Sequence, residues 1–288
     1  MKFSKNRKEA KTCPCGKSNK DLKFAPYEGF SKYGYCHSCG KTFQPDNSVI
    51  IDTRKLEKIH LKPSLIKSSL LDISIESAKK NSNNFLSYIK EKYGAEKSEY
   101  IQKKFLIGNS SRWPGSCVFW QVDEKMKVRS GKVLLYDPVT GKRYKRKNDW
   151  IHSILLRKNI ISEFKLKQCL FGLHQIHNMS LKQLSNTRVA VVESAKSACV
   201  MTIVCPSIIW MSCESLHGLQ LNKFQALKSC NIVFYPDLGK GKNDPFELWS
   251  NRSLQFNKLG YKTRVSDLLV NNATIDQINE KQDIADFF

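Results

Sequence analysis

Residues 189–198 read VAVVESAKSA, a short apolar run that ends in an acid. The run is rich in β-branched residues, which predicts a buried strand, and the residues after it have a helical pattern. Similar segments alternate along the rest of the chain, with strands expected at 207–211, 232–235 and 261–265 and helices at 194–204, 219–228 and 244–260. This alternation is typical of an α/β domain with a mainly parallel sheet.

Two acids stand where predicted strands end. Glu193 follows its apolar run directly, and Asp237 follows the segment 232–236. Ligands of open parallel sheets bind at the carboxyl ends of the strands, so both acids lie at the expected binding edge. If the two strands are neighbours, the carboxylates repel each other unless a divalent cation lies between them. Mg²⁺ and Mn²⁺ prefer carboxylate oxygens and can also bind phosphate, which predicts a metal site here.

Several stretches of this region resemble motifs of Toprim domains, particularly those of phage- and plasmid-type primases. Residues 191–198 resemble the glutamate motif and 234–239 the aspartate motif, while 282–287 resemble a third, acidic stretch and 169–173 the start of the domain. The resemblance implies that Glu193, Asp237 and a distal acid hold catalytic magnesium or manganese.

The distal acids and one lysine have two interpretations each. Asp283 and Asp286 complete the metal site if the C-terminal segment folds back, and otherwise they are surface charges. Lys196 lies close to one turn into the predicted helix after Glu193. There it either reaches a phosphate as part of the catalytic site or extends into solvent.

The sequence also departs from the Toprim pattern. Primases and topoisomerases usually carry D-x-D, whereas the second position here is Gly239. Asp244 is a possible replacement, but it precedes Pro245 in the pattern of a helix N-cap, which is the favoured interpretation. The chain contains no G-x-x-x-x-G-K-[ST] motif, so no fused helicase motor is expected.

The chain is strongly basic. Its 288 residues include 48 Lys and Arg against 26 Asp and Glu, a formal charge of +22. Residues 101–185 alone contain 17 basic and 5 acidic side chains, whereas residues 186–288 contain 11 and 10. Such an excess favours a polyanionic partner, most often nucleic acid. An anionic membrane surface is the alternative, but we expect no membrane partner because no apolar run reaches roughly 18 residues and no strongly amphipathic basic helix stands out.

The densest basic run follows a turn pattern at 137–141 and comprises Lys142, Arg143, Lys145, Arg146 and Lys147. A solvated face and a nucleic-acid surface are both compatible with it. Aromatic residues are interleaved across 113–150, and such rings either stack on unpaired bases or form the core of strands. We predict that the five basic residues bind nucleic acid.

Four of the ten cysteines form two close pairs, Cys13 with Cys15 and Cys36 with Cys39, and each pair is followed by glycine. Such pairs predict a structural zinc site with four thiolate ligands on a β-ribbon, with strands at 24–27 and 33–36. His37 is a less favoured ligand because it lies between two better ones. The other six cysteines are expected to be buried and reduced, which, with a polar N-terminus that lacks a secretory pattern, predicts a cytoplasmic protein.

Together these features predict an α+β protein in four parts. These are a zinc ribbon at 1–45, a linker and helical segment at 46–100, a basic α+β subdomain at 101–185 and a Toprim-like α/β domain at 186–288. This order resembles primase-like proteins of phages, plasmids and mobile elements. The resemblance implies an enzyme that synthesises short primers from nucleotides on single-stranded DNA by metal-dependent nucleotidyl transfer, with a separate replicative helicase as partner.

Two other functions fit the same residues. A non-catalytic, zinc-containing DNA-binding protein with a degenerate Toprim fold would account for Gly239. A Toprim-type nuclease would use the same carboxylates, because such domains also occur in nucleases and topoisomerases. No tyrosine stands in a convincing context for a topoisomerase nucleophile.

Overall fold

The N-terminal ribbon consists of three short antiparallel strands. In the computed structural model, which describes residues 3–44, 62–241 and 244–288, they are β1 (Phe24–Pro26), β2 (Gly34–Cys36) and β3 (Thr42–Phe43), paired in that order. A 3₁₀ turn, η1 (Arg7–Glu9), precedes them. The first two strands lie within the predicted ranges. The third has only two residues, too few for an alternating pattern to show in the sequence.

The chain divides into two compact units, Met1–His60 and Leu61–Phe288. Most of the predicted linker lies outside the described residues. The second unit begins with three helices, α1 (Ser68–Lys80), α2 (Asn84–Tyr93) and α3 (Ala95–Phe105). Asn83 caps α2 by accepting a hydrogen bond from the Leu86 N–H at 3.0 Å. Gly94, with φ 92°, separates α2 from α3.

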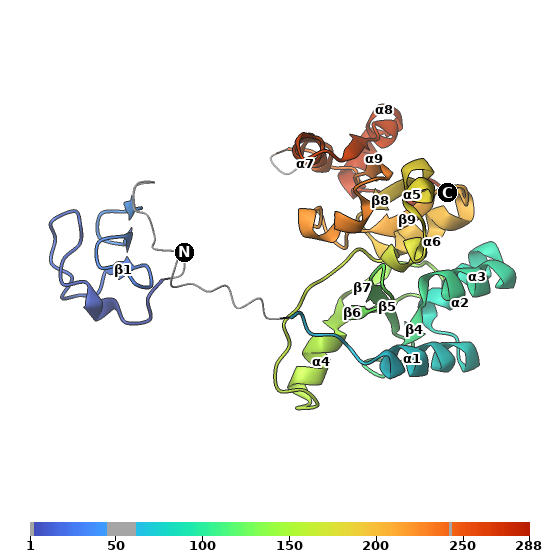
Figure 1. Cartoon of the computed structure of the whole chain (residues 1–288), viewed down its shortest axis with the longest axis horizontal. Helices are drawn as coiled ribbons and strands as arrows, with labels where there is room; N and C mark the ends of the chain where they lie inside the picture. The colour runs from blue at the N-terminus through green and yellow to red at the C-terminus, as the bar shows by residue number, and fades with distance from the viewer. Residues whose placement is uncertain (1–2, 45–61, 242–243) are drawn as a thin grey trace. The chain divides into compact units, whose positions relative to one another are not determined.

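A four-stranded antiparallel sheet follows these helices (Figure 1). Its strands are β4 (Gly108–Asn109), β5 (Cys117–Val122), β6 (Val128–Tyr136) and β7 (Arg143–Trp150), in that spatial order, and α4 (Ile151–Arg157) continues from β7. Side chains alternate across β5 as the strand geometry requires. Val118 and Trp120 pack with α1 and α4, whereas Cys117 and Phe119 pack in the same core as α2 and α3.

The last part of the chain forms the predicted parallel sheet. Its strands are β8 (Arg188–Val192), β9 (Ile209–Ser212), β10 (Asn231–Tyr235) and β11 (Lys262–Val265), in the spatial order β11-β10-β8-β9 with every pair parallel. This arrangement confirms the predicted α+β class with a mainly parallel sheet. Helix α6 (Ala195–Val204) connects β8 to β9, and α7 (Pro245–Lys258) connects β10 to β11. The shorter elements of this region are α5 (Leu181–Asn186), α8 (Leu268–Asn272), α9 (Ile275–Glu280), η3 (Leu173–Ile176) and η6 (Ile284–Phe287).

The helix predicted at 219–228 is wrong. The segment forms two 3₁₀ turns instead, η4 (Leu221–Lys223) and η5 (Gln225–Leu227). Phe224 separates them with φ −106° and ψ 0°, outside the helical range. Leu219, Phe224 and Leu227 are all buried, so these turns bury the apolar residues that suggested a helix.

The two faces of the parallel sheet contribute to different cores. Ala190 and Val192 of β8 pack in the core that also contains α2, α3 and α6, whereas Val189 and Val191 pack with Phe224 and α7. This two-sided burial explains why the strand is apolar at successive positions. None of the helices in the described part of the chain combines the length and apolar character that crossing a bilayer would demand.

Candidate functional site

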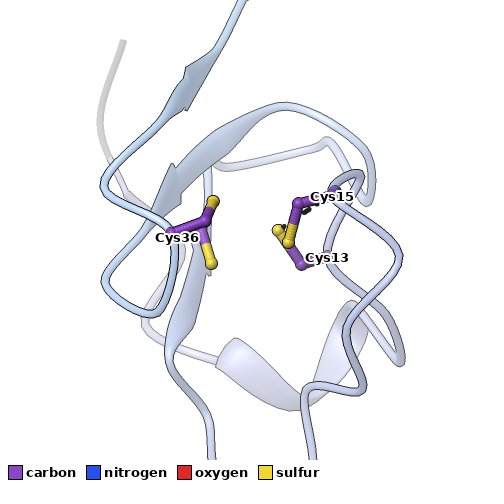
Figure 2. Close-up of side chains that lie close together, drawn as sticks. Cys13, Cys15 and Cys36 are labelled. Atoms are coloured by element: carbon purple, nitrogen blue, oxygen red, sulfur yellow. Dashed lines mark hydrogen bonds between the residues drawn. The ribbon is translucent and has the colours of Figure 1, made fainter.

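The four paired cysteines converge in the N-terminal unit. Their sulfurs all lie within 4.8 Å of one another, and Figure 2 shows Cys13 and Cys15 facing Cys36. Gly16 and Gly40 have φ of 87° and 69°, the left-handed region that lets the backbone turn tightly after each pair. The Cys15 N–H donates to the Cys13 sulfur at 3.4 Å. Four converging sulfurs are a donor set that suits tetrahedral zinc.

The thiols of this cluster hold their protons unequally. Burial raises the pKa of Cys13 to about 12. Burial also opposes ionisation of Cys36, but hydrogen bonds from Cys13 and from the Cys39 and Ser38 N–H groups lower its pKa to about 7. The His37 ring instead packs edge-on against Tyr35, with centroids 4.9 Å apart. It is not part of the sulfur cluster.

Glu193 and Asp237 emerge at the same edge of the parallel sheet. Strands β8 and β10 are direct neighbours, with Val192 opposite Tyr235, and each acid follows within two residues of this pair. Asp237 is held in a strongly unfavourable environment for a charge. Burial and the nearby carboxylate of Glu193 raise its pKa well above the ordinary value, with further contributions from Asp283 and Asp286.

Glu193 lies between opposing charges. Burial raises its pKa, Lys132 acts in the opposite direction, and Asp283 raises it further. The carboxylates of Glu193 and Asp237 therefore repel each other in a partly desolvated setting. A divalent cation between them would relieve that repulsion, so the donor set suits magnesium or manganese.

The C-terminal segment folds back onto this edge. The Leu238 N–H donates to the Gln282 carbonyl at 2.9 Å, which ties the segment to the end of β10. Ser197 of α6 donates its hydroxyl to Asp283 at 2.6 Å. Lys196, largely buried, pairs with Asp286 at 3.2 Å. Lys196 is therefore not a solvated helix lysine.

The distal acids are already engaged with the protein. Asp283 Oδ1 accepts from the Ala285 N–H at 2.7 Å, and Asp286 Oδ2 accepts from the Asp283 N–H at 3.0 Å. Across residues 3–44, 62–241 and 244–288, only the four cysteines form a compact group of three or more potential metal ligands. The structure thus brings the four acids to one sheet edge without gathering their oxygens around a single point.

Position 239, where the Toprim pattern described above would place a second aspartate, is sterically closed. A Cβ at Gly239 would lie 2.6 Å from Cδ and 3.1 Å from Cγ of Pro245, the first residue of α7. Asp244 does not replace the second aspartate of the D-x-D pattern, because its carboxylate caps α7 by accepting a hydrogen bond from the Phe246 N–H at 2.8 Å. The N-cap interpretation of Asp244 is confirmed.

A buried ion pair next to Glu193 was missed by the sequence analysis. Lys132 of β6 reaches Glu214, which follows β9, with Nζ 2.8 Å from Oε2 and side chains 15% and 5% exposed. The Glu214 N–H in turn donates to the Glu193 carbonyl at 2.9 Å. The sequence does contain a pattern that could have predicted this ion pair. Glu214 is a third acid just after an apolar strand, and Lys132 is a cation within the mostly apolar stretch 131–136.

The predicted nucleic-acid residues lie on one exposed edge. Lys142, Arg143, Lys145, Arg146 and Lys147 are all exposed, the last four on β7, the outer strand of its sheet. Tyr136 of β6 pairs with Arg143 and Leu134 pairs with Asn148, so three extra residues bulge out of β7. Bulges of this kind interrupt the ladder and change the direction of the side chains within them.

The interleaved aromatic residues divide between core and surface. Phe119, Trp120 and Tyr136 are buried and belong to the core, whereas Tyr144 is 45% exposed. Trp113 is partly exposed and lies beneath two cations, with Lys147 Nζ 5.5 Å and the Arg112 guanidinium 5.1 Å from its ring centre. Only the exposed rings remain available for stacking on bases.

The chain has structural neighbours among primases. It is similar to the primase fragment of the bacteriophage T7 primase-helicase protein, with 13% identity, a TM-score of 0.40, and coverage of 93% of this chain and 95% of that one. The E. coli primase catalytic core is 12% identical, with a TM-score of 0.43 and coverage of 74% of this chain and 77% of that one. A DNA primase domain from Pseudomonas aeruginosa is 14% identical, with a TM-score of 0.42 and coverage of 77% of this chain and 79% of that one. No curated protein matches the chain.

A family match covers more than half of the sequence. Residues 83–238 match the family described as "Domain of unknown function (DUF6371)". The matched region runs from the start of α2 to just beyond β10, so it contains both Glu193 and Asp237. The cysteine cluster and the C-terminal acids lie outside it. The chain belongs to the DUF6371 family.

Proposed function

We propose that the protein is a primase-like enzyme that joins nucleotides on a single-stranded DNA template by metal-dependent nucleotidyl transfer at a Toprim-type site. The observation that carries the proposal is the juxtaposition of Glu193 and Asp237 at the ends of neighbouring parallel strands. Burial, and after it the nearby carboxylate of Glu193, raise the pKa of Asp237, a perturbation that is common at functional sites and that a bound cation would relieve. In this proposal residues 1–45 form the zinc ribbon, 101–185 the basic DNA-holding part and 186–288 the catalytic domain.

The roles of the side chains follow from their surroundings. Glu193 and Asp237 would hold Mg²⁺ or Mn²⁺, which would supply charge stabilisation at the phosphate and an activated 3′-hydroxyl. Lys132 keeps positive charge beside Glu193 and favours its ionised, metal-binding form. Asp286 pairs with Lys196 and Asp283 adds electrostatic attraction, which keeps Lys196 at the same edge, where its ammonium group can face an incoming phosphate.

The proposal is tested by measuring incorporation of labelled nucleotides on single-stranded DNA with Mg²⁺ or Mn²⁺. Glu193→Gln should lower incorporation by about a hundredfold or more, because it removes a charged ligand that acts on the transition state. Glu247→Gln on the exposed start of α7 is the matched control and should leave incorporation unchanged. Both variants should still bind DNA in a gel-shift assay. Equal incorporation by the wild type and Glu193→Gln would refute the assignment.

One observation favours a second function. The closure of position 239 by Pro245 leaves the site without the usual second aspartate, as expected for a non-catalytic DNA-binding protein with a degenerate Toprim fold. Salt-sensitive DNA binding without any divalent-metal binding at Glu193 and Asp237 would support that alternative. Mg²⁺-dependent shortening of the labelled strand would instead indicate a nuclease. The cytoplasmic setting, the mobile-element context and the separate helicase partner stay predictions.

A further inference from the structure

A groove of about 700 Å³ opens between α1 and α4, on the side of the antiparallel sheet away from the candidate acids. Its floor is formed by Val118 and Trp120 of β5, whose neighbours Cys117 and Phe119 point to the opposite face. Figure 1 shows α1 and α4 flanking this sheet. The volume lies within the range of about 300–1,000 Å³ that is typical of small-ligand sites.

The walls of the groove combine apolar surface with hydrogen-bonding groups. Ile73 of α1 and Ile160 after α4 line it and are 66% and 62% exposed, which is unusual for isoleucine. Serine and asparagine side chains, among them Asn81 and Ser111, supply donors and acceptors along the same walls. A flat, partly apolar group with polar edges, such as a nucleobase, matches this lining.

The charge at the groove has one sign. Arg112, Arg157 and Lys158 line it, and no acidic side chain does so among the described residues. Asp149 lies behind the two arginines and accepts hydrogen bonds from both, at 2.9 Å from Arg112, so it fixes guanidinium groups from two different elements at the same place. With two arginines on the one carboxylate and Lys158 also lining the groove, the rim keeps a net positive charge that suits a phosphate.

The rim is continuous with the basic bulge of β7. Lys147 of the bulge and Arg112 of the groove both lie over the ring of Trp113. A nucleic-acid strand held along β7 would therefore pass directly to the groove. We propose that this groove binds a nucleoside phosphate unit, with its base against the exposed apolar walls at Ile73 and Ile160 and its phosphate at Arg112, Arg157 and Lys158. This site is separate from the proposed catalytic edge and does not depend on nucleotidyl transfer there.

Two probes distinguish the source of the unit, and both are titrated calorimetrically without added divalent cation, so that metal-dependent binding at Glu193 and Asp237 does not contribute. ATP represents a free nucleotide and pentathymidylate represents a strand. Lys158→Glu reverses one rim charge, and Ile73→Glu places an acid on the wall. Lys182→Glu on α5 makes the same charge change as Lys158→Glu away from the groove and is the matched control. All three side chains are exposed, so thermal unfolding should be unchanged.

We expect each groove variant to weaken binding of the preferred probe about tenfold, which corresponds to about 1.4 kcal/mol, while the control stays within about twofold. The continuity with β7 predicts tighter binding of pentathymidylate than of ATP. The reverse preference would identify a free nucleotide as the ligand and would still support the site. Binding of neither probe, or equal binding by the groove variants and the control, would overturn the proposal.

Discussion

Replacing Lys132 by methionine should destabilise the second unit strongly. The Lys132 ammonium lies 2.8 Å from Glu214 Oε2 and 3.2 Å from the Glu214 carbonyl oxygen, and the two side chains are 15% and 5% exposed. The other carboxylate oxygen, Oε1, has no hydrogen-bond partner among the residues the structure describes. Methionine has similar length but no charge, so it would leave the Glu214 carboxylate buried and unpaired.

The magnitude follows from this burial. Removing one partner of a fully buried ion pair costs about 3–5 kcal/mol. Lys132 keeps some contact with solvent, so we expect a loss of about 2–3 kcal/mol in the free energy of unfolding. Urea unfolding followed by circular dichroism at neutral pH measures it. Lys127→Met, at an exposed lysine in the turn between β5 and β6, is the control and should stay within about 0.5 kcal/mol of the wild type.

The double variant Lys132→Met with Glu214→Gln separates the contribution of the ion pair to the free energy of unfolding from the contribution of side-chain packing. It should recover most of the loss, because removing both charges leaves no unpaired carboxylate in the core. If Lys132→Met were as stable as the Lys127→Met control, or if the effects were strictly additive in the double variant, the buried ion pair would not stabilise the fold in this way.

Three further predictions concern the cysteine cluster, the closed position and pH. Chelation of zinc should unfold the N-terminal unit, and Cys36→Ser should do the same; an unchanged NMR spectrum of that unit after chelation would contradict a structural metal. Gly239→Ala should lower the free energy of unfolding in urea by about 1–3 kcal/mol, because its Cβ would overlap Pro245. A change below about 0.5 kcal/mol would show that α7 shifts to make room for the added Cβ. The His174 ring bonds the Lys104 carbonyl at 3.0 Å, and burial lowers its pKa, so the unfolded chain binds a proton more readily than the folded one. The free energy of unfolding should therefore fall as the pH drops below about 6.5, by at most about 1.4 kcal/mol per pH unit, and His174→Gln should remove this part of the slope; equal slopes would contradict it.

The parallel sheet and its acidic edge were accessible from the sequence because local patterns encode them. A run such as 189–192 has no polar position and is rich in β-branched residues, which is typical of a strand covered on both faces. An acid directly after such a run is therefore expected at a strand end. Glu193 and Asp237 could therefore be placed without knowledge of the strand order, and the pairing of β8 with β10 then made them neighbours.

The contacts that surround those acids could not be predicted in the same way. Lys132 and Glu214 are 82 positions apart and come from different sheets, so no local pattern links them. Ser197 and Asp283 are 86 positions apart and meet only because the C-terminal segment folds back. The aromatic residues of β5 and β6 were ambiguous because strand alternation alone does not tell which face is covered.

The proposed chemistry requires that Glu193 and Asp237 together bind a divalent cation. Titration of the full chain with Mn²⁺, followed by electron paramagnetic resonance of the free ion, tests it most directly. The cysteine cluster should first be loaded with zinc and the excess zinc removed, so that neither the cluster nor free zinc competes with Mn²⁺ for the site. We expect a Mn²⁺ site in the wild type and in Glu247→Gln, and we expect Glu193→Gln and Asp237→Asn each to weaken it by about tenfold or more. Absence of a site in the wild type, or identical binding by all four proteins, would contradict it.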